Sequence, residues 1–287
     1  MQPIKKWNVE KLIMSTVNTQ ELKYTFLLQD ILSNGIEKSD RTGTGTIALF
    51  HRSLRFDLQK GFPLLTTKFV SFKSVLAELL WFISGSTNNN DLRKMGCTIW
   101  DEWADGNGEL GEIYGFQWRK FSYGHDYWGD YQSFDQLSWL INEIKTNPDS
   151  RRLYVTAANP LSRNNQALDC CHNYFQVQIL NGKLNLYFQM RSSDVFLGLP
   201  FNIASYALLA HMLALETRYE VGELVYSGVD VHLYSNHIEQ AKTQAERIPL
   251  DFPELKINKK PFFEYTMGDF EIVGYEHLGK LSAPVAV

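Results

Sequence analysis

The sequence is poor in cysteine, and its few cysteines are not spaced to form a disulfide framework. Among 287 residues there are three, Cys97, Cys170 and Cys171. Adjacent residues of an extended chain point away from each other, so Cys170 and Cys171 are not expected to pair. With 44% hydrophobic and 14% aromatic residues, the chain can bury a core without such bonds. We therefore expect reduced cysteines and a cytoplasmic location.

The sequence also lacks a strong excess of charge and long apolar runs. The formal net charge of −4 gives no basic surface for nucleic acid or a membrane, so an anionic ligand would need a local cluster of arginines. Apolar runs stay below the roughly 18 residues that cross a bilayer, and charges interrupt the first residues, so neither a membrane helix nor a signal peptide is expected. No repeat or Pro/Gly/Ser-rich linker divides the chain. We expect one domain over residues 1–287, with 1–19 as an N-terminal extension.

The spacing of apolar residues predicts long helices. Residues 21–34 and 70–84 each carry a helical pattern that ends before a glycine, and the second has a clear apolar stripe. Residues 201–217 form a still more apolar helix, which we expect to be buried. Between these helices, residues 173–190 alternate apolar and polar side chains around Asn181-Gly182, the strongest short signal for a hairpin. Long helices mixed with hairpin strands predict an α+β fold.

The hairpin also predicts which residues face each other. A two-residue turn in regular register sets Cys171 opposite Ser192 and His172 opposite Arg191. Cys171 and Arg191 then meet at the same end of the ladder but point to opposite faces. A direct contact between them would need a β-bulge or the end of regular pairing.

The Cys170-Cys171-His172 triplet has three possible interpretations: a buried structural pair, half of a metal site, or a nucleophile. A thiol near a guanidinium has a lowered pKa and becomes a usable nucleophile. Zinc is disfavoured, because no second Cys/His cluster at ligand spacing accompanies the triplet. Taken alone, such a triplet is more often ordinary sequence than a catalytic site.

Arginines gather in three short stretches, "DRTGTG" at 40–45, "DSRR" at 149–152 and "MRSSD" at 190–194. Guanidinium groups suit phosphate, and the glycines of the first stretch allow the backbone to approach a ligand closely. Any one stretch could be solvated surface charge. Together, and with a cysteine near the third, they favour a site for a nucleotide monophosphate.

Two further features could belong to a site. Residues 98–119 are dense in aromatic and acidic side chains, which could line a pocket for a flat ring or simply form a core loop. Glu78 shares a helix face with Ala77 and Trp81, so burial would raise the pKa of its carboxyl and suit it to proton transfer. A partly exposed glutamate is the alternative.

Several long motifs closely resemble the thymidylate synthase family and occur in the same order. They are "DRTGTGT", "FPLLTTK", "ELLWFISGSTN", "IWDEWAD", "YGFQWR", "NPDSRR", "RSSDVFLGLPFNIASYALL" and "HLYSNH". The resemblance implies an α+β fold with a large bent mixed sheet and long buried helices. It also implies a homodimer across the sheet, with dUMP as substrate and 5,10-methylenetetrahydrofolate as one-carbon donor.

The resemblance implies roles for individual residues. Cys171 would add to carbon 6 of the pyrimidine, and carbon 5 of the resulting enolate would attack the folate methylene. The other catalytic residues would be Glu78, Tyr114, Arg191, His172 and Asp194. The dUMP would be bound by Arg41, Ser192, Ser193, Asn202, His232, Tyr234 and, from the partner subunit, Arg151 and Arg152. The folate would contact Lys68, Trp100, Trp103, Leu168, Asp194, Leu197, Gly198, Phe201 and Ala286. No metal site is implied, and an amide at Asn202 points to dUMP rather than dCMP.

Some positions depart from the family pattern. Where the family has tryptophan, proline, glutamine and glycine, this chain has Ala158, Cys170, Met190 and Val229. Glu112 replaces a proline, Phe69 a basic residue and Ser71 a folate-site residue.

These departures bear on the last step of the reaction. Thymidylate synthase transfers a hydride and must exclude water, whereas the related phage hydroxymethylases let water add to the exocyclic methylene. Losing the tryptophan at 158 and the proline at 170 would make room for water, so the sequence favours a dUMP hydroxymethylase. Trp100, Leu168 and the C-terminal tail favour thymidylate synthase, the alternative. An inactive nucleotide- or RNA-binding homologue is a third, more remote interpretation.

Overall fold

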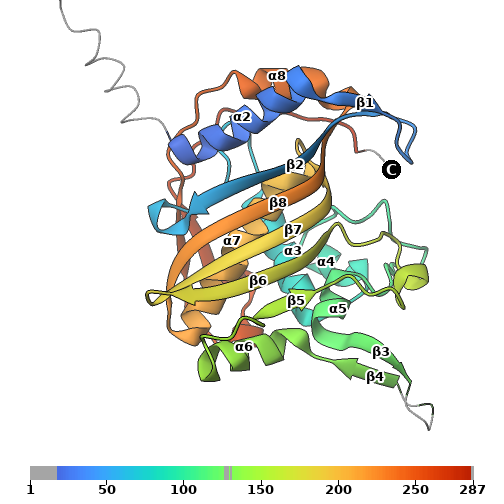
Figure 1. The fold of residues 1–287 in the computed structure, drawn as a ribbon, viewed down its shortest axis with the longest axis vertical. Coiled ribbons are helices and arrows are strands. Elements are labelled where there is room, and N and C mark those ends of the chain that lie inside the picture. Colours follow the sequence, from blue (N-terminus) through green and yellow to red (C-terminus); the bar gives the residue numbers. More distant parts are fainter. Residues whose placement is uncertain (1–17, 126–128, 130, 286–287) are drawn as a thin grey trace, which may run out of the picture.

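A six-stranded mixed sheet forms the centre of the molecule in the computed structural model, which describes residues 18–125, 129 and 131–285. Its strand order is β1-β2-β8-β7-β6-β5 (Figure 1). The strands are β1 (Ile36–Lys38), β2 (Thr46–Asp57), β5 (Tyr154–Thr156), β6 (His172–Leu180), β7 (Lys183–Asp194) and β8 (Glu220–Tyr234). Strands β7 and β8 are parallel, and the other neighbours are antiparallel. The predicted α+β fold with a large mixed sheet is confirmed.

Two hairpin-like pairs lie outside this sheet. They are β3 (Phe121–His125) with β4 (Tyr131–Phe134), and β9 (Glu254–Ile257) with β10 (Phe270–Val273). The helices of the described residues are α2 (Thr19–Asn34), α3 (Phe72–Ser84), α4 (Asn89–Lys94), α5 (Tyr114–Lys120), α6 (Gln136–Thr146), α7 (Gly198–Thr217) and α8 (Ile238–Ala245). Short 3-10 turns lie at Leu58–Lys60, Arg163–Asn165, Ser235–His237, Phe262–Glu264 and Met267–Asp269.

The predicted helices end where the sequence indicated, but their starts differ: α2 and α7 begin earlier than expected and α3 begins later. The side chain of Asn18 accepts hydrogen bonds from the backbone N–H groups of Gln20 (3.1 Å) and Glu21 (3.3 Å), so helix α2 begins at Thr19. Asn18 and Thr19 therefore belong to the folded chain, and residues 1–17 of the proposed extension lie outside the described residues. Gly85 closes α3 in the left-handed conformation that favours glycine.

Helix α7 is the apolar helix predicted at residues 201–217. It is long and apolar enough to cross a membrane by length and composition, yet most of it is buried. Figure 1 places α7 and α3 behind the sheet, and α7 packs against β7, β8 and α3. This is the burial expected of the core helix of a soluble protein. Its enclosure explains why nearly the whole circumference is apolar.

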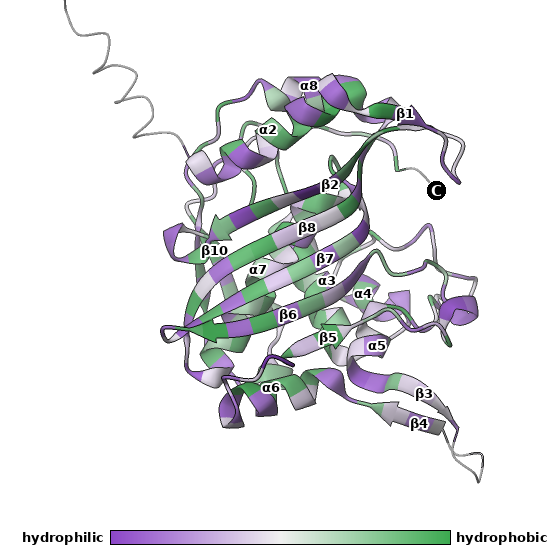
Figure 2. Cartoon of the chain, in the orientation of Figure 1, coloured by the Kyte–Doolittle hydropathy of each residue, from purple (hydrophilic) through white to green (hydrophobic). Residues whose placement is uncertain are grey.

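The sheet has one covered and one open face. Along β2, β8, β7 and β6, hydrophobic residues alternate with polar ones in Figure 2, as expected when one face packs on a core. In Figure 1 the near face is crossed by no helix of the described residues. Exposed apolar side chains in the sheet include Phe50 on β2 (82% exposed) and Tyr154 on β5 (43%). An open sheet face with large apolar residues is a surface suited to another protein subunit.

The hairpin of β6 and β7 forms with the predicted turn, in which both Asn181 and Gly182 have positive φ. Its register is regular from Leu180 back to Tyr174 and then shifts, so that His172 pairs with Met190. The extra residue on β6 is Asn173, whose carbonyl accepts from Ala157 N–H on the β5 side (2.9 Å). The predicted pairs at this end of the ladder were therefore wrong by one residue, because a β-bulge intervenes.

Candidate active site

A cavity of about 430 Å³ opens at the ends of β6 and β7 beside α3, α5 and α7. Its walls are Arg41, Glu78, Ile99, Trp100, Trp103, Tyr114, Leu168, Cys171, His172, Met190, Ser192, Asp194, Leu197, Gly198, Phe201, Asn202, Tyr234 and Val285. The sequence-based prediction included all of these as site residues except Ile99, Met190 and Val285. Residues from distant parts of the chain thus converge on one space.

The β-bulge brings Cys171 and Arg191 directly opposite each other. The backbone N–H of Arg191 donates to the Cys171 carbonyl at 2.9 Å. The guanidinium donates from Nε to the carbonyl of Cys170 (3.0 Å) and from Nη2 to that of Asp169 (2.6 Å). Arg191 therefore holds the turn before the cysteine by its backbone. The bulge allows the contact between Cys171 and Arg191 that a regular hairpin register would not allow.

The thiol of Cys171 lies in a mixed electrostatic environment. Burial raises its pKa above the ordinary value, and the positive charge of Arg191 opposes this increase. The sequence predicted a lowered pKa from the guanidinium alone, and this prediction was wrong because desolvation is the larger effect. The hydroxyl of Tyr114 accepts a hydrogen bond from the backbone N–H of Cys171 at 2.8 Å. These contacts fix the cysteine at the cavity wall.

Glu78 is a buried carboxyl in the same wall. It comes from α3 and accepts a hydrogen bond from Nε1 of Trp100 at 2.7 Å. Burial raises its pKa to about 7, against the smaller opposing effect of the indole bond. The sequence-based expectation of a desolvated carboxyl is confirmed. A group with a pKa near neutrality can both accept and release a proton under ordinary conditions.

His172 is neutral and tightly packed. Burial lowers its pKa to about 3. Its ring stacks on Tyr114 with centroids 3.9 Å apart and planes 12° apart, and its Nδ1 lies 2.9 Å from the hydroxyl of Tyr206. The imidazole therefore has one nitrogen bound on the core side, and the ring lines the cavity.

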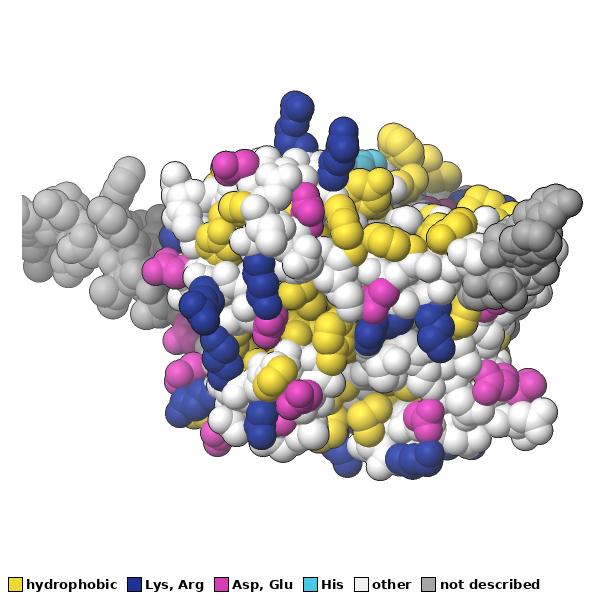
Figure 3. Space-filling view, turned by 90° about the horizontal axis from the view of Figure 1, so that it is seen from below, with side chains coloured by type: hydrophobic (Ala, Val, Ile, Leu, Met, Phe, Trp, Pro, Cys, Tyr) yellow, Lys and Arg dark blue, Asp and Glu magenta, His cyan; other side chains and the backbone are white. Residues whose placement is uncertain are grey.

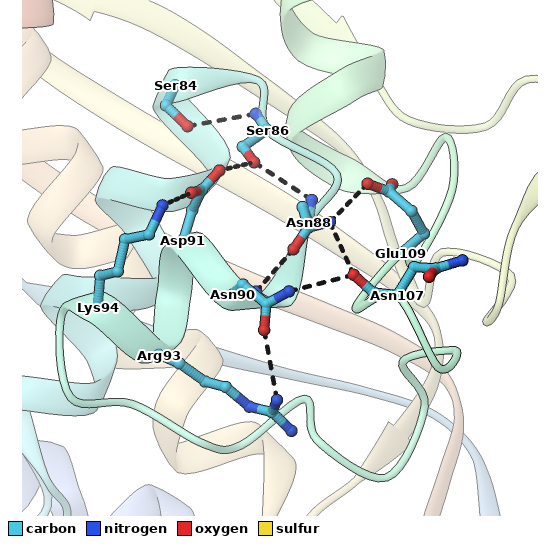
Figure 4. Close-up of polar contacts among 9 residues, drawn as sticks. All are labelled: Ser84, Ser86, Asn88, Asn90, Asp91, Arg93, Lys94, Asn107 and Glu109. Carbon is cyan, nitrogen blue, oxygen red and sulfur yellow. Dashed lines mark hydrogen bonds and ion pairs between the residues drawn. The ribbon is translucent and has the colours of Figure 1, made fainter.

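The segment carrying Trp100 and Trp103 is held by a network of amide side chains. Asn88 donates to Glu109 (2.7 Å) and to the carbonyl of Asn107 (3.2 Å), which also accepts from Asn90 (Figure 4). This network joins the start of α4 to the loop that follows the two tryptophans. Their rings meet edge to face, 5.6 Å apart, and present an aromatic wall to the cavity.

Polar groups lie at the opposite side of the cavity. Asp40 accepts from the backbone N–H of Gly45 (2.7 Å) and from the hydroxyl of Thr42, which folds the "DRTGTG" loop around Arg41. The loop hydrogen bonds, chiefly that from Thr42, hold the pKa of Asp40 below its usual value. Ser192 and Tyr234 join Arg41 in the wall. The combination of a guanidinium and hydroxyls suits a phosphate and a sugar.

Asp194 also reaches the cavity, where it organises backbone. Its Oδ1 accepts from the N–H groups of Phe196 (3.0 Å) and Leu197 (3.1 Å) immediately before α7. Asn202, one turn into α7, presents its amide to the same cavity. The end of β7 and the start of α7 therefore supply both a carboxylate and an amide.

Some predicted site residues lie outside the cavity wall. Arg151 and Arg152 are exposed in the turn before β5. Ser193 is fully buried, and His232 is buried with its Nδ1 3.1 Å from Asp230. Ala286 lies outside the described residues.

Lys68 is also turned away from the cavity. Its ammonium donates to the carbonyl of Phe196 and lies 4.0 Å above the ring of that residue. Burial lowers its pKa to about 8. Its contact with the segment before α7 makes it a support of that wall in this structure, and its predicted contact with the folate stays a prediction.

The departures from the family pattern fall in different places. Met190 lines the cavity. Ala158 is exposed, and Cys170 is 2% exposed in the core with a pKa raised to about 12 by burial. Neither of these two residues is part of the cavity wall.

Sequence reasoning missed Ile99 and Val285. Ile99 lies in the aromatic stretch at residues 98–119, which the sequence indicated as a possible pocket lining. Its aromatic neighbours were therefore the only sign of its position. Val285 reaches the wall because the carbonyl of Pro284 lies 2.7 Å from Nε2 of His237, which ties the tail to the turn after β8. No local pattern in the sequence predicts the contact between the tail and His237.

Metal-ligating residues do not gather in the part of the chain that the structure describes: it holds no cluster of three His, Cys, Asp or Glu side chains that could bind an ion. The cavity instead combines a thiol, a carboxyl, aromatic rings and, at one end, a guanidinium with hydroxyls. This is the equipment of an enzyme that adds a nucleophile to a flat heterocycle of a nucleotide.

The family comparison agrees with that class. A family model described as thymidylate synthase matches residues 22–287, and the chain belongs to this family. The family transfers a one-carbon unit to dUMP and uses methylenetetrahydrofolate as the donor. The aromatic and apolar wall formed by Trp100, Trp103 and Phe201 fits the flat ring system of a folate.

Proposed function

We propose that this chain forms a covalent adduct between Cys171 and carbon 6 of dUMP and transfers a methylene from folate to carbon 5. The observation that carries the proposal is the convergence of Cys171, Glu78 and Asn202 on one cavity. When bound, methylenetetrahydrofolate supplies the one-carbon unit. The residues of the chain then bind, orient and move protons.

Each group has a chemical reason for its place. The Cys171 thiolate attacks carbon 6, and negative charge develops on the pyrimidine oxygen at carbon 4. The amide of Asn202 offers one donor and one acceptor, which match the carbonyl and N–H at the uracil edge. Glu78 is at the midpoint of its titration near pH 7, so it can relay the proton that carbon 5 loses.

For the last step, we propose hydride transfer, which yields dTMP and dihydrofolate. Trp100, Leu168 and Val285 all belong to the cavity wall, and these apolar groups exclude water from the exocyclic methylene. Ala158 is exposed and Cys170 is buried in the core, and neither is part of the cavity wall.

The second candidate is the dUMP hydroxymethylase that the sequence departures favour. Met190 supports it, because this residue pairs with His172 and changes the polar lining where water would be ordered. In that reaction water adds to the exocyclic methylene and tetrahydrofolate is released. Both candidates share every preceding step.

One incubation separates the two candidates. Purified protein with dUMP and methylenetetrahydrofolate is followed by absorbance of dihydrofolate and by the mass of the nucleotide product. Dihydrofolate formed in equal amount to dTMP supports hydride transfer. A product one oxygen heavier than dTMP, with no dihydrofolate, supports the hydroxymethylase. Release of tritium from carbon 5 of labelled dUMP reports both reactions, and its absence would contradict the proposal as a whole.

We further propose a cytoplasmic homodimer that forms across the open sheet face. Arg151 and Arg152 are exposed and outside the wall of their own cavity. Pairing through the sheet would allow them to bind the phosphate in the partner's cavity. Figure 3 shows acidic, basic and apolar side chains interspersed on the face seen from below, without a basic field suited to nucleic acid.

A further inference from the structure

The hydroxyl of Tyr206 contacts the catalytic histidine from the core side. Tyr206 comes from α7 and is 2% exposed, and its hydroxyl oxygen lies 2.9 Å from Nδ1 of His172. The tyrosine ring stacks on Phe188 with centroids 4.3 Å apart and planes 12° apart. It also packs against the rings of Trp118 and Phe175. The packing leaves the hydroxyl little freedom to choose another direction.

The direction of this hydrogen bond follows from the number of available partners. Within the described residues, His172 is the only hydrogen-bond partner of the Tyr206 hydroxyl. If Nδ1 of His172 were the donor, the phenolic proton would be left without an acceptor in the core. An unpaired buried donor costs about 1–3 kcal/mol, whereas donation from Tyr206 to Nδ1 satisfies both groups. The hydroxyl therefore donates and Nδ1 accepts.

The tautomer of His172 follows from that direction. Burial keeps the imidazole neutral by lowering its pKa to about 3. A neutral imidazole that accepts at Nδ1 carries its proton on Nε2. Because Nδ1 is bound on the core side, Nε2 is the nitrogen available to the cavity that His172 lines.

We propose that Tyr206 is a positioning residue that fixes His172 as the Nε2–H tautomer and so gives the cavity a neutral hydrogen-bond donor. The stack of His172 on Tyr114 sets the plane of the ring, and Tyr206 sets its rotation and its proton. The donor serves the pyrimidine oxygen, or a water bound to it, when Cys171 adds. A preorganised donor at a developing negative charge stabilises the transition state more than the ground state. The catalytic part of this role rests on the proposed function.

Other titratable groups surround the pair. Glu78 on α3 and Cys170 before β6 act electrostatically on Tyr206, and Cys170, Cys171 and Tyr206 act on Tyr114 of α5. The tyrosines and the thiols have raised pKa values and are neutral at pH 7, whereas Glu78 is about half ionised there. None supplies an alternative acceptor for the Tyr206 proton.

The test is the substitution Tyr206→Phe, which keeps the ring and removes the hydroxyl. The matched control is Tyr226→Phe, a buried tyrosine that packs against the same Phe188 ring from β8 and lies outside the cavity wall. Nitrogen-15 NMR of histidine-labelled protein, with His172→Gln used for assignment, reports the tautomer directly. Tritium release from labelled dUMP reports turnover for either last step.

We expect wild-type His172 to carry its proton on Nε2 and Tyr206→Phe to show a mixture of tautomers. In that variant kcat should fall about tenfold to a hundredfold, as when other partners that orient a reactive imidazole are removed, while KM for dUMP stays within about twofold. Tyr226→Phe should leave both the tautomer and kcat unchanged.

Two results would overturn the proposal: a wild-type His172 with its proton on Nδ1, or a Tyr206→Phe variant that keeps wild-type tautomer and kcat. A protein that folds and shows the expected tautomer but releases no tritium would contradict the proposed function instead. The spectroscopic result separates the two failures.

Discussion

At the scale of single residues, the site depends on burial as much as on charge. Cys171, Glu78 and His172 all have pKa values shifted toward their neutral forms, and desolvation is the largest cause for each. Burial therefore favours the neutral form of each group, although Glu78 is still about half ionised near pH 7. Arg191 opposes this for the cysteine, and a bound phosphate would share the same guanidinium.

Cys171→Ser should abolish turnover. The serine hydroxyl is a far weaker nucleophile than a thiolate, so we expect tritium release to fall by at least about a thousandfold. Equilibrium binding of dUMP should remain, since the phosphate and uracil contacts are untouched. Cys170→Ser is the matched control, because that thiol is buried outside the cavity wall, and it should keep most activity. Equal loss in both variants would argue against Cys171 as the nucleophile.

Glu78→Gln should separate activity from stability. The folded protein keeps Glu78 protonated up to a pKa of about 7, whereas the unfolded chain releases this proton near 4.5. Between these values the folded state binds more protons, so stability falls as pH rises and then stays low. The amide still accepts from Trp100 and carries no charge. We expect the variant to be more stable than wild type at pH 8, by at most about 3 kcal/mol, and equal at pH 4.

The measurement is urea unfolding of both proteins at the two pH values, together with tritium release. Turnover should fall by about a hundredfold to ten-thousandfold, as for loss of a proton-transfer group. A variant that is destabilised at pH 8 would contradict the assignment of a raised pKa.

At the scale of elements, the sequence predicted the helices and the hairpin turn more accurately than the contacts between elements. The three helices and the hairpin turn follow from local rules of periodicity and glycine conformation, and they are confirmed. The β-bulge at Asn173 was recognised only as a condition, because its cause lies in contacts with the β5 side, far from the hairpin turn. Tyr206 and Val285 escaped detection for the same reason: an apolar helix and a tail give no sign of which side chain they turn toward a site.

A second buried glutamate gives an element-scale contrast to Glu78. Glu21 on α2 accepts hydrogen bonds from the backbone N–H and the hydroxyl of both Thr66 and Thr67, at 2.7 to 3.0 Å. These bonds fasten α2 to the segment before α3. Burial nonetheless raises the pKa of Glu21.

Glu21→Gln should therefore destabilise the protein, the opposite response to the same change at Glu78. The NH2 group of the glutamine would face the donor groups of Thr66 and Thr67 and leave some of them unpaired. We expect the free energy of unfolding to fall by about 1–3 kcal/mol at pH 8. Urea unfolding of the two variants side by side is the measurement. A stabilised Glu21→Gln protein would show that desolvation, and not the four donor groups, governs this site.

At the scale of the whole molecule, the proposed dimer relates the cavity to the open face of the sheet. The cavity contains Arg41 and Ser192, but the exposed Arg151 and Arg152 lie elsewhere. A dimer in which each chain supplies arginines to the other would make the two halves of the site inseparable.

Mixed dimers test this arrangement. A double variant, Arg151→Ala with Arg152→Ala, and the variant Cys171→Ser should each be inactive alone. Refolded together, the heterodimer contains one site with both an intact cysteine and intact arginines. We expect recovery of up to about a quarter of wild-type activity per chain, from statistical pairing of subunits. If sedimentation verifies the dimers and no activity is recovered, the two arginines act in the site of their own subunit.

The bulge at Asn173 limits which insertions and deletions of codons in β6 the protein can tolerate. Side chains of a strand alternate between faces, so the position of Cys171 depends on the number of residues between it and the turn at Gly182. Losing or gaining one codon between Tyr174 and Leu180 would shift the regular pairing by one residue and move the buried Phe175 or Val177 off the core face, whereas loss of Asn173 itself would remove only the bulge. Length variation should therefore be tolerated far better between β3 and β4 than within β6. In a library of single-codon deletions, the variants that lack one residue from 174 to 180 should be inactive.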